Sequence, residues 1–210
     1  RVISLFIFDT EILEKLEDKA DRRVDFIHQT LQHLKNQLEE LGSSLVVLFG
    51  NPVELWEKIE ARSVYTNRDY EPYARQRDNS VQHILEQRGI TFKAFKDQVI
   101  FDCREVVKED GKPYTIFTPY SRKWKSQLTK FHTKSYPTEK YFKNFQKSEH
   151  LGFPSLHDIG FEATNAVFPE RIVKSSIIGH YDKLRNFPAV RGTTKLSGHL
   201  RFGTVSIRKL

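Results

Sequence analysis

The chain has 210 residues and a formal net charge of +7, and 38% of its residues are hydrophobic, a fraction sufficient for one or two domains with a core. Its single cysteine, Cys103, excludes a disulfide framework and a cysteine-rich zinc site, and it fits a cytoplasmic location. Because no apolar run approaches the ~18 residues of a membrane span, we expect no membrane partner.

Short apolar runs alternate with amphipathic helical patterns over the first 95 residues. The runs at 2–8, 45–49, 63–66 and 90–95 predict strands, and the segments between them predict helices. The first helix is expected to begin after an N-cap at Asp21. One apolar stripe is predicted along this helix, formed by Val24, Ile27, Leu31, Leu34, Leu38 and Leu41. The alternation predicts an α/β fold, with a Rossmann-like parallel sheet and flanking helices.

The pattern changes in the second half of the chain. Thr118 and Pro119 are expected to open a helix, as N-cap and first helical residue. Residues 129–168 show no clear period and are interpreted as a long interdomain connector. From Pro169 a helical pattern resumes and predicts an all-α segment up to residue 210. We therefore expect an α/β domain over 1–128, a connector over 129–168 and a helical domain from 169 to 210.

The basic residues are concentrated toward the C-terminal end of the chain. Residues 1–118 carry 17 Lys and Arg against 21 Asp and Glu, whereas residues 170–210 carry nine against two. A basic region that also contains aromatic residues is typical of proteins that bind a polyanion such as nucleic acid. The alternative is an ordinary solvated, lysine-rich surface.

A stretch at residues 192–203, GTTKLSGHLRFG, combines three glycines, hydroxyl side chains and two cations, Lys195 and Arg201. That mixture suits a bound phosphate, although a polar turn before a helix explains it equally well. It is not a P-loop, because Thr204 stands where the lysine is required. No histidine has a partner at ligand spacing, so we expect no metal.

Charged and aromatic residues also gather after two predicted strands. Asp9 follows the first strand, at the sheet edge where α/β proteins bind ligands. Residues 67–78, NRDYEPYARQRD, follow the third strand. A salt-bridged helix cap is the alternative interpretation of this second segment.

Four motifs resemble the DNA photolyase and cryptochrome family, and they occur in the family's order. These are FIFD at 6–9 with NRDYEPYARQRD at 67–78, KPYTIFTPY at 112–120, YDKLR at 181–185, and the segment 192–208. The resemblance implies an antenna domain followed by the start of a flavin-binding helical domain. It implies a class I deoxyribodipyrimidine photo-lyase, which repairs cyclobutane pyrimidine dimers in DNA by a light-driven, FAD-dependent reaction. A cryptochrome-type photoreceptor without repair activity is the alternative.

The resemblance also implies site residues. FAD would be bound by Tyr181, Thr193, Thr194, Lys195, Leu196 and Ser197, and damaged DNA would be contacted by Arg185. A second, antenna chromophore would lie near Asp9, Asp69 and Glu71. Folate-binding members have an Asn-Glu pair where this chain has Tyr73 and Ala74, so a deazaflavin or flavin antenna is favoured over folate. No catalytic residue is assigned.

Parts of the family pattern are not found in the chain. The first strand of the family, most of its flavin domain and its electron-transfer tryptophans have no counterpart in the sequence. The chain is therefore interpreted as a piece of a photolyase-like protein. We expect it to be a monomer, and inactive by itself.

Overall fold

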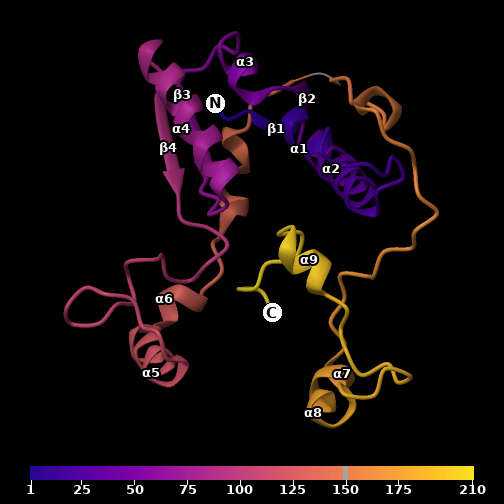
Figure 1. The fold of residues 1–210 in the computed structure, drawn as a ribbon. Coiled ribbons are helices and arrows are strands. Elements are labelled where there is room, and N and C mark those ends of the chain that lie inside the picture. Colours follow the sequence, from indigo (N-terminus) through magenta and orange to yellow (C-terminus); the bar gives the residue numbers. More distant parts are fainter. Residues whose placement is uncertain (149–150) are drawn as a thin grey trace. The chain divides into compact units, whose positions relative to one another are not determined.

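The computed structural model describes residues 1–148 and 151–210 (Figure 1). These residues form two compact units. Unit 1 consists of Arg1–Phe8, Ile12–Phe49 and Lys134–Leu210, and unit 2 of Asp9–Glu11 and Gly50–Thr133. Each unit has its own hydrophobic cluster. The interleaved segments show that the packing does not follow the order of the chain.

Unit 1 is built around strands β1 (Ser4–Asp9) and β2 (Leu45–Gly50), which form a two-stranded sheet and whose last residues, Asp9 and Gly50, belong to unit 2. The short helix α1 (Thr10–Leu13) follows β1, and the long helix α2 (Arg22–Glu40) precedes β2. The predicted N-cap of α2 is confirmed, because Oδ1 of Asp21 accepts a hydrogen bond from the backbone N–H of Arg23 at 2.7 Å.

The apolar stripe of α2 is confirmed in its centre and wrong at its edge. Val24, Leu31 and Leu38 are buried in the cluster, whereas Leu34 and Leu41 are more than 40% exposed. A seven-residue repeat drifts by about 20° per heptad on a straight helix. Leu34 and Leu41 are therefore rotated away from the line of Val24, Leu31 and Leu38, toward the exposed face of the helix.

A segment that was expected to be a connector contributes to the core of unit 1. Residues 153–164, here called the docked segment, contain the 3₁₀ helix η2 (His157–Ile159). Ile159 and Phe161 are at most 3% exposed and pack in the same cluster as Val24 and Leu31 of α2. An irregular segment can bury apolar side chains without any period, so periodicity gave no sign of this packing.

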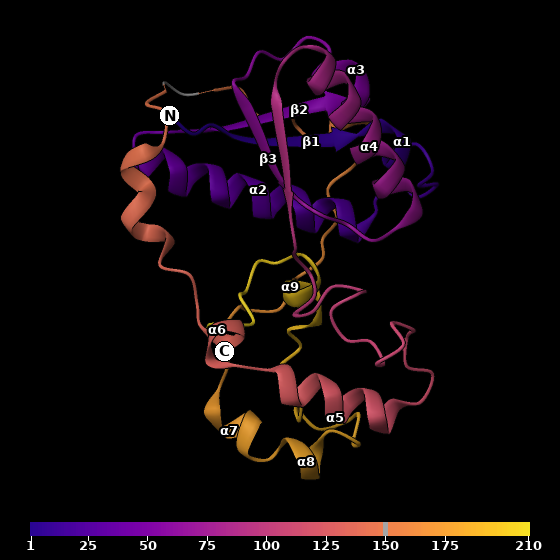
Figure 2. The same cartoon turned by 90° about the vertical axis from the view of Figure 1, so that its left-hand side faces the viewer.

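Unit 2 contains a second two-stranded sheet. Strands β3 (Ser63–Asn67) and β4 (Thr91–Phe95) run parallel, paired from Ser63 with Thr91 to Asn67 with Phe95 (Figure 2). Helices α3 (Pro52–Trp56) and α4 (Pro72–Gln87) begin with proline, whose fixed φ and missing N–H suit the first helical position. The cluster of Val64, Val81, Leu85 and Ile90 joins α4 to β3, and Phe92 of β4 packs against it. The expected α/β, Rossmann-like class is confirmed, with hydrogen bonds dividing the four strands into two pairs.

The helices outside this α/β pattern are mostly short. Unit 2 continues with α5 (Phe117–Gln127) and α6 (Lys130–Thr133), and unit 1 contains η1 (Thr138–Asn144), α7 (Ser175–Gly179), α8 (Tyr181–Leu184) and α9 (Ser197–Arg201). Thr118 was expected as the N-cap of α5, but the helix begins at Phe117, with Ile116 at the cap. None of the helices in the described residues is long and apolar enough to cross a membrane.

Candidate functional site

The stretch that suits a phosphate packs against helix α8. Residues 192–197, here called the phosphate loop, begin at Gly192, where an added Cβ would lie 2.6 Å from the carbonyl oxygen of Leu184. Only glycine allows so close an approach of two backbone segments. Leu184 ends α8, which begins at Tyr181 and is followed directly by Arg185. The fold therefore brings the loop next to the helix that carries the other two predicted residues.

The polar side chains of the phosphate loop are accessible, while one apolar side chain anchors it. Thr193, Lys195 and Ser197 are exposed, and Thr194 is half-buried. Leu196 is only 4% exposed and accepts a backbone hydrogen bond from the N–H of Leu200 in α9. The loop thus exposes hydroxyls and an ammonium group, while the buried Leu196 fixes its backbone.

Lys195 adopts a backbone conformation that residues with a side chain seldom occupy. Its φ is +55°, in the left-handed region that favours glycine. Such conformations persist where the surrounding structure enforces them, and they occur often at binding sites. Here the buried Leu196 on one side and the tight contact of Gly192 on the other enforce the turn.

Tyr181 and Arg185 lie one helical turn apart and contact each other. The guanidinium carbon of Arg185 is 5.4 Å from the centre of the Tyr181 ring, a cation–π arrangement. Both side chains are exposed, Tyr181 by 44%. The structure therefore pairs a residue expected to bind FAD with one expected to bind DNA.

The second candidate region, in unit 2, is centred on Asp9. Asp9 is 6% exposed, and its carboxylate accepts a hydrogen bond from the hydroxyl of Tyr73 at 2.8 Å and lies 3.6 Å from the guanidinium of Arg77. Arg77 also donates two hydrogen bonds to Asp78, at 2.8 and 3.0 Å. Burial and the hydrogen bond to Asp9 raise the pKa of Tyr73, which keeps its hydroxyl protonated as a donor.

Sequence reasoning identified Asp9 but missed Tyr73 and Arg77 as its partners. These two residues are four apart in the first turns of α4, so they share one face of that helix. Their spacing and their position at the start of a crossover helix were the available signals. Only the tertiary packing shows that this face meets Asp9.

The remaining predicted antenna residues belong to the turn before α4. Oδ1 of Asp69 accepts hydrogen bonds from the backbone N–H groups of Tyr70 and Glu71, at 2.6 and 3.2 Å. Glu71 is exposed at the N-cap of α4 and makes no side-chain cap. The hydroxyl oxygen of Tyr70 is buried without a hydrogen-bond partner among the described residues. Within residues 1–148 and 151–210, no group of three or more acidic, His or Cys residues could hold a metal ion.

We expect Tyr73→Phe to lower the free energy of unfolding by about 1 kcal/mol, because the buried Asp9 loses one hydrogen bond and the ring is retained. Urea denaturation measures the change. Tyr65→Phe is the matched control, since the Tyr65 side chain is 63% exposed and its loss of a hydroxyl should be neutral. Equal effects of the two substitutions would contradict the assigned contact.

Comparison with known proteins relates this geometry to one family. A family model described as DNA photolyase matches residues 1–140. A Synechococcus deoxyribodipyrimidine photo-lyase is 31% identical over the whole chain, which spans about half (47%) of that relative's length. An uncharacterized 31.6 kDa Synechococcus protein is also 31% identical. The alignment spans 99% of the present chain and 77% of that protein's length.

Among solved structures, an archaeal photolyase from Sulfolobus tokodaii with two FAD molecules aligns with the whole chain. The TM-score is 0.63, the identity is 22%, and the alignment covers 47% of that structure. This likeness agrees with the α/β fold described above. With the family model matching two thirds of its length, the chain belongs to the DNA photolyase family.

Proposed function

We propose that the whole protein is a deoxyribodipyrimidine photo-lyase, which repairs cyclobutane pyrimidine dimers in DNA by a light-driven, FAD-dependent reaction. One observation in particular supports this proposal: Gly192 packs on Leu184 and so places the phosphate loop beside Tyr181 and Arg185, in a chain of the photolyase family. The alignment with a relative named deoxyribodipyrimidine photo-lyase covers the full chain.

The donor set of the phosphate loop fits the pyrophosphate of FAD. Lys195 offers an exposed ammonium group, and Thr193, Thr194 and Ser197 offer hydroxyls, which together suit an anion that is bound by several donors. Tyr181, exposed beside the loop, would contact the cofactor with its ring, and Leu196 would support the loop backbone. Bound FAD would supply light absorption and the transferred electron.

We expect the 210-residue chain by itself to retain FAD below one molecule per chain. Of the six candidate residues only Leu196 is buried, so an FAD bound here would keep much of its surface in water and would dissociate readily. The visible spectrum of the purified chain measures occupancy. A flavin band at full stoichiometry after gel filtration would contradict this expectation.

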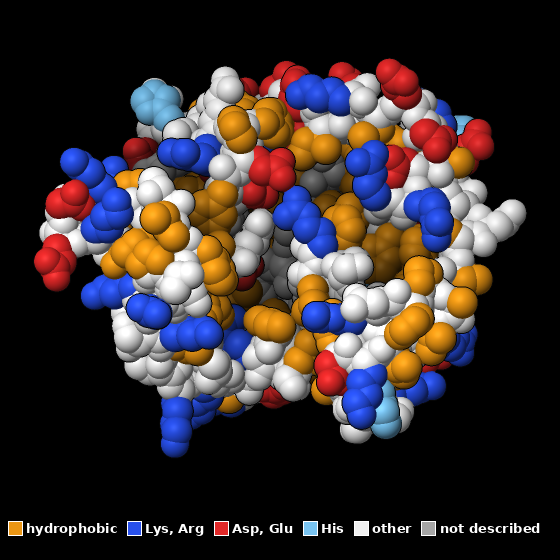
Figure 3. Space-filling view, turned by 60° about the horizontal axis from the view of Figure 1, so that its bottom comes forward, with side chains coloured by type: hydrophobic (Ala, Val, Ile, Leu, Met, Phe, Trp, Pro, Cys, Tyr) orange, Lys and Arg blue, Asp and Glu red, His pale blue; other side chains and the backbone are white. Residues whose placement is uncertain are grey.

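The proposed DNA contact is Arg185, in a region with a strong excess of positive charge. The face drawn in Figure 3 carries many Lys and Arg side chains with hydrophobic side chains between them. Cationic groups neutralise phosphates, and apolar groups suit unstacked bases, so such a mixture favours damaged DNA with an extruded lesion. The protein would act as a monomer, without a membrane partner.

Arg185→Ala should weaken DNA binding and reduce the slope of log affinity against log salt concentration by about one phosphate contact. Arg185→Lys is the matched control, because it keeps the charge and should keep the slope. Fluorescence anisotropy with damaged duplex at several salt concentrations measures both variants. A slope unchanged in Arg185→Ala would remove this residue from the DNA interface.

For the antenna chromophore we propose a flavin or deazaflavin near Asp69 and Glu71, in preference to folate. The solved Sulfolobus tokodaii photolyase holds two FAD molecules, with the implication of a novel light-harvesting cofactor, which supports a flavin in this role. Asp9 fits less well as a direct contact, since its carboxylate is buried and already paired with Tyr73 and Arg77. Asp9 would then order the two α4 side chains behind the chromophore.

The test of the proposed activity uses protein expressed from its complete gene and reconstituted with FAD. Duplex DNA containing a thymine dimer is incubated with the reduced protein in blue light and in the dark, and the remaining dimers are quantified by a dimer-specific endonuclease. We expect loss of dimers in the light only. Bound FAD without light-dependent repair would instead support the cryptochrome-type photoreceptor.

A further inference from the structure

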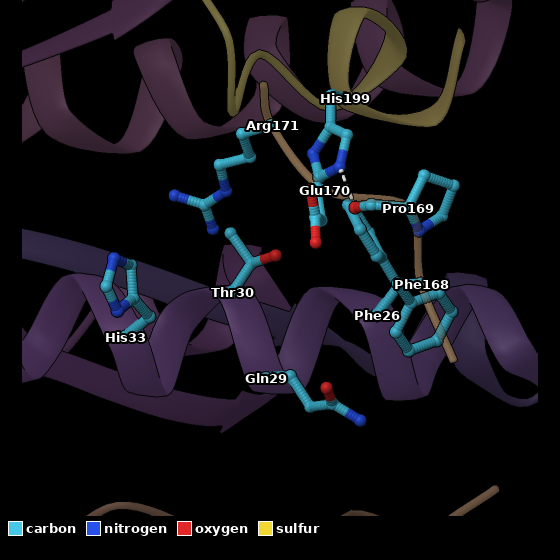
Figure 4. A pocket seen from close by; sticks show the side chains of 9 residues that line it. All are labelled: Phe26, Gln29, Thr30, His33, Phe168, Pro169, Glu170, Arg171 and His199. Carbon is cyan, nitrogen blue, oxygen red and sulfur yellow. Dashed lines mark hydrogen bonds between the residues drawn. The ribbon is translucent and has the colours of Figure 1, made fainter. Parts of the chain in front are cut away.

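His199, the third residue of α9, is buried, and both nitrogens of its ring make hydrogen bonds. The residue is 4% exposed. Nε2 lies 2.7 Å from the carbonyl oxygen of Pro169, and Nδ1 lies 2.7 Å from Oγ1 of Thr204. A carbonyl oxygen only accepts, so Nε2 carries the proton and donates to Pro169. Figure 4 shows this bond beside a cavity of about 360 Å³.

The same ring packs on helix α2. The rings of His199 and Phe26 are edge-to-face, with centroids 5.3 Å apart and an angle of 62° between their planes. Phe26 is itself 8% exposed, and the centroid of its ring lies 5.0 Å from that of Phe168 and 5.4 Å from that of Phe202. The imidazole therefore lies where α2, the segment around Pro169 and α9 meet.

Helix α9 continues directly from the phosphate loop. Ser197 is both the last residue of the loop and the first of the helix, and the buried Leu196 is its cap. With only five residues, α9 is too short to be stable alone, so its position depends on tertiary contacts. Gly192 fixes the other end of the loop against α8. The loop is thus held between two anchors, of which His199 supplies the second.

We propose that His199 is a positioning residue for FAD, which acts by fixing the phosphate loop through α9. The inference rests on the proposed function, because it assigns the loop to the pyrophosphate. His199 does not contact the cofactor in this proposal. Its hydrogen bonds to Pro169 and Thr204 order Lys195 and Ser197 before FAD arrives, so that binding does not have to order the loop.

The experiment combines amide hydrogen exchange with FAD titration of the protein from its complete gene. In His199→Ala we expect faster exchange over residues 193–201 and about tenfold weaker FAD binding, with unchanged exchange in the buried part of α2. His199→Gln can still donate to the Pro169 carbonyl, so it should restore most of the exchange protection over 193–201 and most of the FAD affinity. His33→Ala is the matched control, since His33 lines the same cavity from α2 and should change neither readout.

The outcomes separate this inference from the proposed function. Unchanged exchange over 193–201 in His199→Ala, or an equal loss of FAD affinity in His33→Ala, would overturn the positioning role. Faster exchange in a protein whose wild type binds no FAD would support the anchor and reject FAD as the ligand of the loop. If His199→Ala loses its far-UV circular dichroism, Thr204→Val replaces it with the same expected direction. This variant removes the Nδ1 contact and the longer hydrogen bond, at 3.4 Å, from the Thr204 hydroxyl to the His199 carbonyl oxygen, and it keeps the bond to Pro169.

Discussion

Asp25→Ala is expected to lower the free energy of unfolding by about 3 kcal/mol, because it removes the charged acceptor that holds the docked segment on α2. Asp25 is 1% exposed and accepts hydrogen bonds from the Thr164 N–H at 2.8 Å, from the Thr164 hydroxyl, and from the Gln29 amide at 2.8 Å. The substitution leaves the half-buried N–H and hydroxyl of Thr164 without this acceptor, whereas the exposed Gln29 amide can bond water instead. Urea denaturation followed by circular dichroism measures the loss.

The same contact predicts a dependence on pH. Burial opposes ionisation of Asp25, but the hydrogen bonds from Thr164 and Gln29 outweigh it and hold the pKa of this carboxyl below its usual value. A lowered pKa in the folded state means that the stabilisation is present above about pH 4 and is lost as the pH falls through the folded pKa. Asp25→Asn should abolish this contribution to the acid loss of stability.

Gln32→Ala is the control for Asp25→Ala, because Gln32 lies on the same helix and bonds only the exposed Asn36 among the described residues. We expect a change below about 0.5 kcal/mol. A loss in Asp25→Ala no greater than in this control would show that the docked segment is held by its apolar residues alone.

Gly192→Ala is expected to displace the phosphate loop from α8 and to cost about 2 kcal/mol. An added Cβ would lie 2.6 to 2.7 Å from the backbone carbonyl and the Cβ of Leu184, so one of the two segments must move. We expect faster amide exchange over residues 192–197 and weaker FAD binding by the whole protein. Both follow from the loss of the contact that sets the loop beside Tyr181.

Gly198→Ala is the matched control in the same stretch. An added Cβ at Gly198, within α9, would meet no atom within 4 Å. Alanine favours helix over glycine by up to about 1 kcal/mol, so this variant should be neutral or slightly stabilising. If both glycine variants lower stability equally, the close contact with Leu184 is not what requires glycine at position 192.

The α/β class and most regular elements followed from the sequence itself. Apolar runs of strand length and a proline or Asp at helix starts are local signals, because they depend on residues within a few positions of each other. Strands β1 to β4 and helices α2 and α4 were predicted in this way, with ends that shift by one or two residues. The composition of the phosphate loop and of the turn before α4 was equally visible.

Only the tertiary structure decided which distant residues meet. The contact of Asp9 with Tyr73, 64 positions away, and the bond of Thr164 to Asp25, 139 positions away, leave no periodic trace. The same is true of His199 and the carbonyl of Pro169. Local pattern reports the conformation that a segment prefers, whereas burial and hydrogen bonding depend on what packs against it. The sequence alone therefore determined the elements and their chemistry, and packing decided how the phosphate loop is held.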